Sequence, residues 1–230
     1  MNVELAGNRL QLRPDRTAWW PRRRMLLVAD LHLGKDQVFR SAGVAIPGGV
    51  LDAELRALAD AVDASGAERL VVLGDLVHAA PGEERAWTRR LGEWRRARSE
   101  LGIGVVLGNH DRGLAPWLAE WRMENLGAVL ELDGLRLCHD VDLDRPPPGL
   151  SGHVHPAVRL QAAGDALRVP AFARRGDHVI LPSFGRFTGG FQGLDPREWQ
   201  MLAVAGRGVR AVPGSGTSAS NRDPDQDAGG

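Results

Sequence analysis

Histidine, aspartate or asparagine follows an apolar run at five separate places in the chain. Imidazole nitrogens, carboxylate oxygens and amide oxygens are the ligands that manganese, iron and zinc take in proteins. A single histidine at a strand end is more often a structural residue held by backbone partners, but chance does not explain the whole set. The sequence therefore predicts a metal site, with the candidate ligands Asp30, His32, Asp75, Asn109, His139, His153 and His155.

The number of candidate ligands exceeds what one metal ion needs. Two metals about 3.5–4 Å apart, bridged by one carboxylate, would use them all and form a clamp for in-line attack on phosphorus. Asp75 lies in the central segment and is the natural bridge. Asn109 would contribute a neutral oxygen, which limits negative charge beside an anionic substrate. The predicted chemistry is hydrolysis of a phosphate ester.

The elements that must position these residues follow from the apolar patterns. In extended geometry, Asp30 and His32 point to the same side of a strand. Glycines at 74, 108 and 152 are expected to let each loop turn sharply after its strand. Alternating strands and helices, then mostly strands, predict α/β packing around two sheets. We expect hairpins at 3–12 and 129–138 and helices at 50–64, 84–98 and 116–123. Further strands are expected at 25–29, 71–73, 104–107, 157–160, 166–169, 179–181 and 199–204. We also expect a loop at 13–24 and a connecting segment at 39–47.

Composition narrows the class of protein. The chain of 230 residues has no apolar run of membrane-spanning length and no signal-peptide pattern at its start. Its single cysteine, Cys138, fits a reducing compartment, so we expect a cytoplasmic protein. A net charge of zero gives no indication of a nucleic-acid partner. We expect one domain over 1–212 and a disordered tail over 213–230, which lacks apolar residues to anchor it.

The ordered motifs resemble a known superfamily. Asp30-x-His32, Gly74-Asp75, Gly108-Asn109-His110-Asp111, His139 and Gly152-His153-x-His155 resemble the five signature blocks of the binuclear metallophosphoesterase (calcineurin-like) superfamily. The resemblance implies a four-layer αββα sandwich with two metals at the carboxyl ends of the central strands. It implies a metal-bridging hydroxide as nucleophile and His110 as the acid that protonates the leaving oxygen. The implied ligand sets are Asp30, His32, Asp75 and His155 for one metal, and Asp75, Asn109, His139 and His153 for the other.

A narrower resemblance rests on His78 and on residues 181–190. Many members of the superfamily have a second aspartate three residues after the bridging one, where this chain has His78. That residue and the segment Leu-Pro-Ser-Phe-Gly-Arg-Phe-Thr-Gly-Gly resemble the ligase-associated DNA-damage-response endonucleases, the PdeM family. The resemblance implies a manganese-dependent phosphodiesterase that incises single-stranded DNA, beside an ATP-dependent DNA ligase and a helicase. Iron or zinc would also suit the ligands.

Several residues near these motifs are candidates for contacts with the substrate. His78 either orients a metal ligand or acts on the phosphate beside His110, and we favour the second role. Lys35, Arg40 and Arg186 are candidates for the DNA path. Phe184 and Phe187 could stack on bases or fill the core. The arginines of the helix at 84–98 either form a solvated face or contact phosphates.

Two alternatives to the endonuclease remain open at this stage. A phosphatase or nucleotide hydrolase would use the same two-metal clamp, because that clamp does not choose a diester over a monoester. A non-catalytic scaffold could keep the fold without metals. A scaffold has no reason to keep the complete ligand set together with His110.

Overall fold

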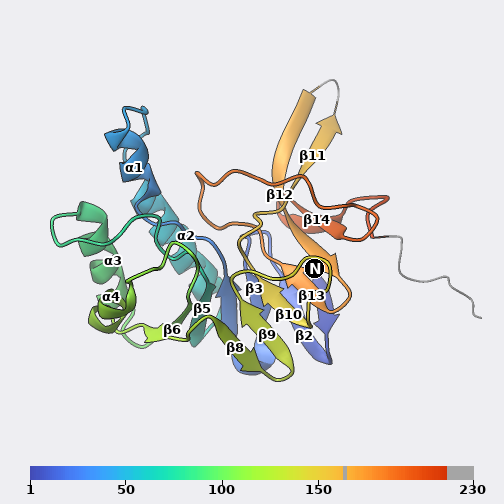
Figure 1. Cartoon of the computed structure of the whole chain (residues 1–230), viewed down its shortest axis with the longest axis horizontal. Coiled ribbons are helices and arrows are strands. Elements are labelled where there is room, and N and C mark those ends of the chain that lie inside the picture. The colour runs from blue at the N-terminus through green and yellow to red at the C-terminus, as the bar shows by residue number, and fades with distance from the viewer. Residues whose placement is uncertain (163–164, 217–230) are drawn as a thin grey trace, which may run out of the picture.

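A seven-stranded sheet with helices on one face forms the first half of the molecule (Figure 1). The computed structural model describes residues 1–162 and 165–216. The strand order is β1-β2-β3-β4-β5-β6-β7, and the strands from β4 to β7 are parallel. The elements are β1 Asn2–Leu5, β2 Asn8–Leu12, β3 Ala18–Trp20, η1 Pro21–Arg23, β4 Met25–Val28, α1 Lys35–Ser41, α2 Val50–Ser65, β5 Arg69–Leu73, α3 Ala86–Arg96, β6 Gly102–Val106, α4 Ala115–Glu120 and β7 Glu124–Asn125.

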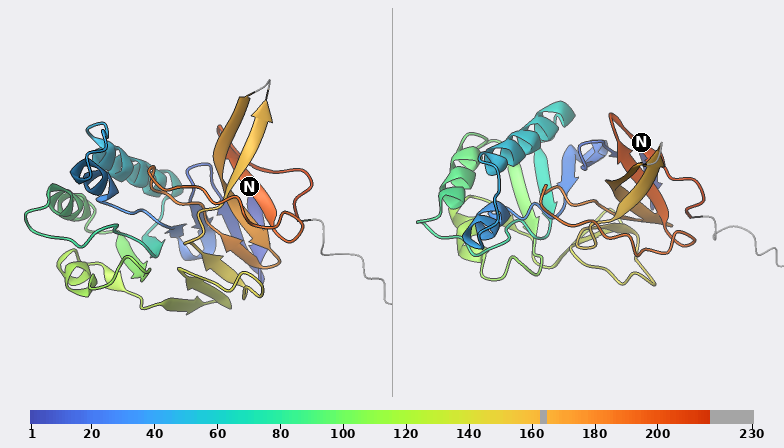
Figure 2. Two further views of the ribbon diagram at one scale, coloured as in Figure 1. Left: turned by 45° about the horizontal axis from the view of Figure 1, so that its top comes forward. Right: turned by 90° about the horizontal axis from the view of Figure 1, so that it is seen from above.

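The second half of the chain forms an eight-stranded sheet that packs against the first. Its order is β15-β14-β12-β13-β10-β9-β8, and β11 pairs with β12 alone. The β11–β12 hairpin projects from the body of the molecule (Figure 2). The strands are β8 Val129–Leu132, β9 Leu135–Cys138, β10 Gly149–Ser151, β11 Ala157–Ala162, β12 Asp165–Arg175, β13 His178–Ile180, β14 Gln200–Ala205 and β15 Gly208–Ala211.

The central strands are buried on both faces, which explains their continuous apolar sequences. In β4, Leu26 and Val28 pack toward the helices, whereas Leu27 packs into the core between the two sheets. Side chains alternate between faces along a strand, so a strand covered on both sides must be apolar throughout. The two layers of core hold these strands rigidly up to the points where the functional loops begin.

Helices α2, α3 and α4 pack on the outer face of the first sheet. The predicted stripe of α2 is confirmed, since Leu51, Leu55, Leu58 and Val62 are buried. The outer face of the second sheet is covered by loop residues around Leu194 and Trp199. The predicted α/β fold with two packed sheets is therefore confirmed, and among the described residues loops take the place of helices in the layer outside the second sheet. No described helix is long and apolar enough to cross a membrane.

The structure corrects two of the expected loops. Within 13–24, Ala18–Trp20 forms β3, which pairs with both β2 and β4. Three residues are too few to show an alternating pattern. Within 39–47, the chain begins with the end of α1, whose only buried residue is Asp36. A helix without an apolar stripe gives no periodic signal.

The proposed tail over 213–230 lies mostly outside the described residues. Its first residues pack against the second sheet. Ser215 Oγ accepts a hydrogen bond of 2.9 Å from the Met201 backbone N–H. The Gly216 backbone N–H donates to Pro196 O at 2.6 Å. Ser215 and Gly216 of the expected tail therefore contact the rest of the domain, and residues 217–230 lie outside the described residues.

Strand register brings the carboxyl ends of the key strands together. In the first sheet, Val28 pairs with Val72, and Leu73 pairs with Val106. In the second sheet, β9, β10 and β13 are parallel, so their carboxyl ends also share one edge. The two edges are joined where the Phe184 backbone N–H donates to Ala29 O at 2.9 Å. All loops that carry predicted ligands therefore meet in one place.

Candidate metal centre

The structure gathers the seven predicted metal ligands at the joined edges of the two sheets. Each follows a parallel strand whose register is fixed by the core. Four come from loops of the first sheet and three from loops of the second. The first four are Asp30 and His32 after β4, Asp75 after β5 and Asn109 after β6; the other three are His139 after β9, and His153 and His155 after β10.

One group of donor atoms forms around Asp30 and His32. Asp30 Oδ1 lies 3.4 Å from His155 Nε2. His32 Nε2 lies 3.7 Å from Asp75 Oδ2. Asp30, His32 and His155 each offer an atom within 4.8 Å of the others, a spacing that a shared metal ion requires. These are the residues of the first implied ligand set.

A second group forms around His139 Nε2. Asn109 Oδ1 lies 2.9 Å from it and His153 Nδ1 lies 3.0 Å from it. Asp75 Oδ1 lies 3.5 Å away. His139 Nδ1 is 3.2 Å from Leu73 O, so the proton sits on Nδ1 and the Nε2 lone pair faces the other donor atoms. These are the residues of the second implied set.

Asp75 connects the two groups. Its Oδ2 faces His32, whereas its Oδ1 faces His139. The His110 backbone N–H donates to Asp75 Oδ1 at 3.0 Å and fixes the carboxylate between them. In the same way, the His153 N–H donates to Asp30 Oδ2 at 3.0 Å. The Asp75 carboxylate therefore presents one oxygen to each group of donor atoms.

Buried polar atoms without partners indicate that the site is built for cations. Asp30 Oδ1, His155 Nε2 and both ring nitrogens of His32 are buried and make no hydrogen bond among the described residues. Such groups are costly unless a ligand satisfies them. Burial, and then the charge of Lys35, lowers the pKa of His32 to about 2. The imidazole is therefore neutral and able to bind a metal, so this donor set fits divalent ions.

Five of the seven candidate ligands have left-handed backbone conformations. The φ angles are 55° for Asp30, 48° for His32, 50° for Asp75, 67° for His153 and 52° for His155. Residues other than glycine rarely adopt such angles, and those that do cluster at functional sites. The expected extended geometry of the Asp30-x-His32 segment is therefore wrong. The loops after β4, β5 and β10 instead turn at the candidate ligands themselves.

The glycines of the motifs provide space more than flexibility. Only Gly74 has a positive φ, at 77°. A Cβ at Gly74 would collide with the His139 ring, and one at Gly108 would collide with the Asp75 carboxylate. A Cβ at Gly152 would lie 2.7 Å from Asp30 Oδ2. The expected role in a sharp turn therefore holds for Gly74. At Gly108 and Gly152, glycine is required because a carboxylate lies too close to leave room for a Cβ.

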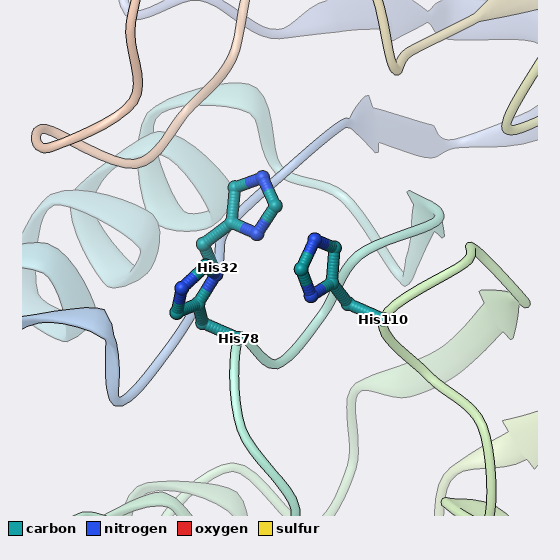
Figure 3. A group of neighbouring side chains, drawn as sticks. All are labelled: His32, His78 and His110. Carbon is teal, nitrogen blue, oxygen red and sulfur yellow. The ribbon is translucent and has the colours of Figure 1, made fainter. Parts of the chain in front are cut away.

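His78 and His110 lie together beside the His32 ring (Figure 3). Their rings stack with centroids 4.8 Å apart and planes inclined by 28°. Both meet the His32 ring edge-on, with centroids at 5.4 and 5.2 Å. Burial lowers the pKa of His78, and its Nδ1 is buried without a described hydrogen-bond partner. Two imidazoles thus border the metal ligands on one side.

The predicted substrate-binding residues Lys35 and Arg40 lie in α1. Lys35 is half-buried and its charge acts on both His32 and His78. Burial lowers the pKa of Lys35. Arg40 is exposed, but it pairs with Asp36 at 3.0 Å and donates to the carbonyls of residues 46 and 47. The structure therefore brings Lys35 to the site and engages Arg40 within its own segment.

The loop at 181–190 contributes a core residue and an exposed arginine. Phe184 is 6% exposed and packs in the core, so the core interpretation is confirmed for this residue. Phe187 is half-buried, with its ring centroid 6.3 Å from that of Phe39. Arg186 lines a cavity beside His155, together with Arg16 and Arg168.

Neither Arg16 nor Arg168 was singled out from the sequence. Their part in the cavity depends on contacts between distant segments, which no local motif reveals. The arginine-rich helix α3 behaves mainly as a structural element. Arg95 is buried and donates to the carbonyl of Arg122 at 3.2 Å, and Arg98 binds Asp63 at 2.9 Å.

Comparisons with known proteins agree with this geometry. No protein-family model matches the chain, and no curated protein matches it. Among solved structures, the Pseudomonas putida nuclease MPE is 31% identical over 92% of this chain and 99% of its own, with a TM-score of 0.78. The phosphoesterase Yfce from E. coli is 19% identical over 82% of this chain and 97% of its own, with a TM-score of 0.43. A protein of unknown function from Aquifex aeolicus, AQ665, is 16% identical over 61% of this chain and 81% of its own, with a TM-score of 0.37.

Proposed function

The chain belongs to the metallophosphoesterase family that includes the Pseudomonas putida nuclease MPE, and on that premise we propose that it is a metal-dependent endonuclease of single-stranded DNA. The similarity extends over nearly all of both chains. It supports hydrolysis of phosphodiester bonds as the general reaction. The arguments for metal dependence and for the roles of single residues come from the geometry of the site.

Seven side chains would hold two divalent cations. Bound there, the cations would polarise the phosphate oxygens and supply an activated water for attack on phosphorus. The mixed nitrogen and oxygen donors suit manganese, with iron or zinc as alternatives. Asp30, His32, Asp75 and His155 would hold one cation, and Asp75, Asn109, His139 and His153 would hold the other.

We assign the proton transfer to His110. Its imidazole is exposed at the mouth of the site, and imidazole is the side chain best able to donate a proton near neutral pH. His78 stacks against it, and burial lowers the pKa of His78; its ring N–H would donate a hydrogen bond to a phosphate oxygen. This pair suits a poor leaving group such as a deoxyribose oxygen.

The proposal also includes the DNA substrate of the enzyme, its functional partners and its cellular compartment. Lys35 and Arg186 are the cations that we place along the DNA strand, with Arg40 supporting the segment beyond Lys35. The resemblance to ligase-associated endonucleases favours single-stranded DNA, and an ATP-dependent DNA ligase and a helicase as functional partners. The single cysteine, Cys138, is free and buried, in keeping with a cytoplasmic setting.

The observation that carries the proposal is the Asp75 carboxylate, whose two oxygens face two separate groups of ligands. The test uses purified protein with manganese and three substrates: circular single-stranded DNA, an activated phosphodiester and an activated phosphomonoester. We expect conversion of the circle to linear DNA and hydrolysis of the diester. Asp75→Asn should abolish both and reduce the number of bound metal ions. Hydrolysis of the monoester alone would exclude the endonuclease and favour a phosphatase.

A further inference from the structure

A cavity of about 200 Å³ lies directly beside the candidate metal centre. His155 belongs to both, because its Nε2 faces Asp30 and its side chain lines the cavity. The floor is fixed to the metal centre by Ser183 Oγ, which donates to Asp30 O at 2.8 Å. Three arginines from separate parts of the chain line the walls: Arg16 before β3, Arg168 in β12 and Arg186 after β13.

Arg16 is held in place by a strained turn. Its φ is 67°, and the turn is closed where the Arg13 backbone N–H donates to Thr17 O at 2.9 Å. Arg16 Nη1 donates to Ser183 O at 3.1 Å. A guanidinium has five N–H donors, and among the described residues this is the only acceptor of the Arg16 side chain. Most of its donors therefore remain available to a ligand in the cavity.

Arg168 is held at the base of the projecting hairpin. It lies directly opposite Arg159 in the antiparallel register of β11 and β12. The two like charges repel each other, so Arg159 does not neutralise Arg168. Its side chain runs past Gly190, where an added Cβ would lie 3.5 Å from Arg168 Cδ. Within the described residues, no hydrogen bond or ion pair engages its guanidinium. The hairpin thus presents an unneutralised cation to the cavity.

Among the described residues, the carboxylate of Glu54 lies beside Arg186 and acts on the charge of Arg16. Glu54 Oε1 accepts a hydrogen bond of 2.9 Å from the Arg186 backbone N–H. Burial raises the pKa of Glu54. Burial and the charge of Arg186 lower the pKa of Arg16, as expected for cations gathered without enough negative charge. An anion would relieve this repulsion.

We propose that the cavity lined by Arg16, Arg168 and Arg186 binds a backbone phosphate of the DNA strand that flanks the phosphate being cleaved. The inference rests on the proposed function. Guanidinium groups match phosphate geometry and form paired hydrogen bonds to it. The shared His155 places the cavity next to the metal ligands, so one strand can occupy both. The site would then favour oligonucleotides over diesters with a single phosphate.

The test compares Arg168→Ala with the control variant Arg22→Ala. Each variant removes one exposed arginine. Arg22 lies in η1 at the amino end of β4, whereas the site lies at the carboxyl end. With manganese, we expect Arg168→Ala to raise KM for a single-stranded oligonucleotide about tenfold relative to its effect on bis(p-nitrophenyl) phosphate, which has one phosphate. Arg168→Lys should recover part of the difference. Equal behaviour of Arg168→Ala and Arg22→Ala on both substrates would overturn the inference.

A binding measurement separates this inference from the proposed function. Fluorescence anisotropy of a labelled oligonucleotide with chelator-treated protein needs no hydrolysis. Loss of one phosphate contact should reduce the slope of log K against log salt by about 0.7 for a single strand. If wild-type protein hydrolyses neither substrate, the proposed function fails. If Arg168→Ala leaves the salt slope unchanged, the inferred phosphate site in the cavity is wrong, but the proposed function is not affected.

Discussion

Asp75 is the residue on which both groups of ligands depend. Its two oxygens face His32 and His139, and the His110 backbone N–H holds the carboxylate in position. The side chain of His110 then extends toward His78 and the open side of the site. In the proposed mechanism, one loop would therefore both hold the Asp75 carboxylate and supply the acid. The proposed roles of the neighbouring residues can be tested by substituting them one at a time.

Replacing His110 by alanine should affect DNA more than an activated ester. The deoxyribose leaving oxygen needs a proton, whereas p-nitrophenolate leaves without one. General-acid catalysis contributes roughly 10²–10⁴-fold, so kcat on DNA should fall by that order and kcat on bis(p-nitrophenyl) phosphate much less. His78→Ala, which removes a phosphate contact, should reduce both rates. Equal losses in His110→Ala would assign that residue to phosphate binding.

Replacing Gly108 by alanine should weaken metal binding. The added methyl group would collide with the Asp75 carboxylate and move the bridge. We expect the metal content after dialysis to fall below two ions per chain, and kcat to fall with it. Gly48→Ala is the matched control, because a Cβ there meets nothing within 4 Å. Full metal content in Gly108→Ala would mean that the loop can move aside without loss.

Secondary-structure elements were predictable where their apolar patterns were long. The central strands and α2 are found where expected, because two-sided burial and a helical stripe leave clear signals. β3 and α1 were missed, since one has three residues and the other buries only Asp36. The candidate ligands were predictable from residue type and spacing. Their left-handed conformations and the arginine cavity were not, because both depend on contacts between distant segments.

His178 should make the second sheet sensitive to acid. It is the first residue of β13, which pairs with β10, and it is fully buried, with Nε2 3.0 Å from Ser151 Oγ and Nδ1 2.7 Å from Pro147 O. Burial lowers its pKa from 6.5 to about 4. The unfolded chain therefore binds a proton between these pH values that the folded chain does not, and stability falls as pH falls through that window.

We expect this residue to cost about 2 kcal/mol of unfolding free energy on going from pH 7 to pH 5. Urea unfolding of chelator-treated protein at both pH values measures the change. His178→Gln does not titrate, so its stability should fall by less over the same interval. An identical decrease in both proteins would show that other groups cause the acid sensitivity.

At the scale of the whole molecule, metal binding should stabilise the packing of the two sheets. Ligands come from both sheets, and five of them occupy costly backbone conformations. At a metal concentration of 100 times Kd, binding to the folded state contributes about 2.7 kcal/mol per site. For a chain of this size we expect each occupied site to raise Tm by on the order of 5–10 °C.

Differential scanning fluorimetry across a manganese titration measures that rise, with chelator as the starting state. Tm should keep increasing with manganese concentration above saturation, as mass action requires. Asp75→Asn is the control, since it removes the bridge and should flatten the dependence. A Tm that does not respond to manganese in the wild type would contradict a structural contribution from the metals.

The boundary between the two sheets is also a boundary in the chain. Every strand of the first sheet precedes residue 126, and every strand of the second follows residue 128. Four candidate ligands therefore lie on one side of that boundary and three on the other. On the proposed function, a chain still being synthesised would carry only four of the seven candidate ligands once its first half had emerged. Hydrolysis of nucleic acid would then require His155 to be translated and the second sheet to pack against the first.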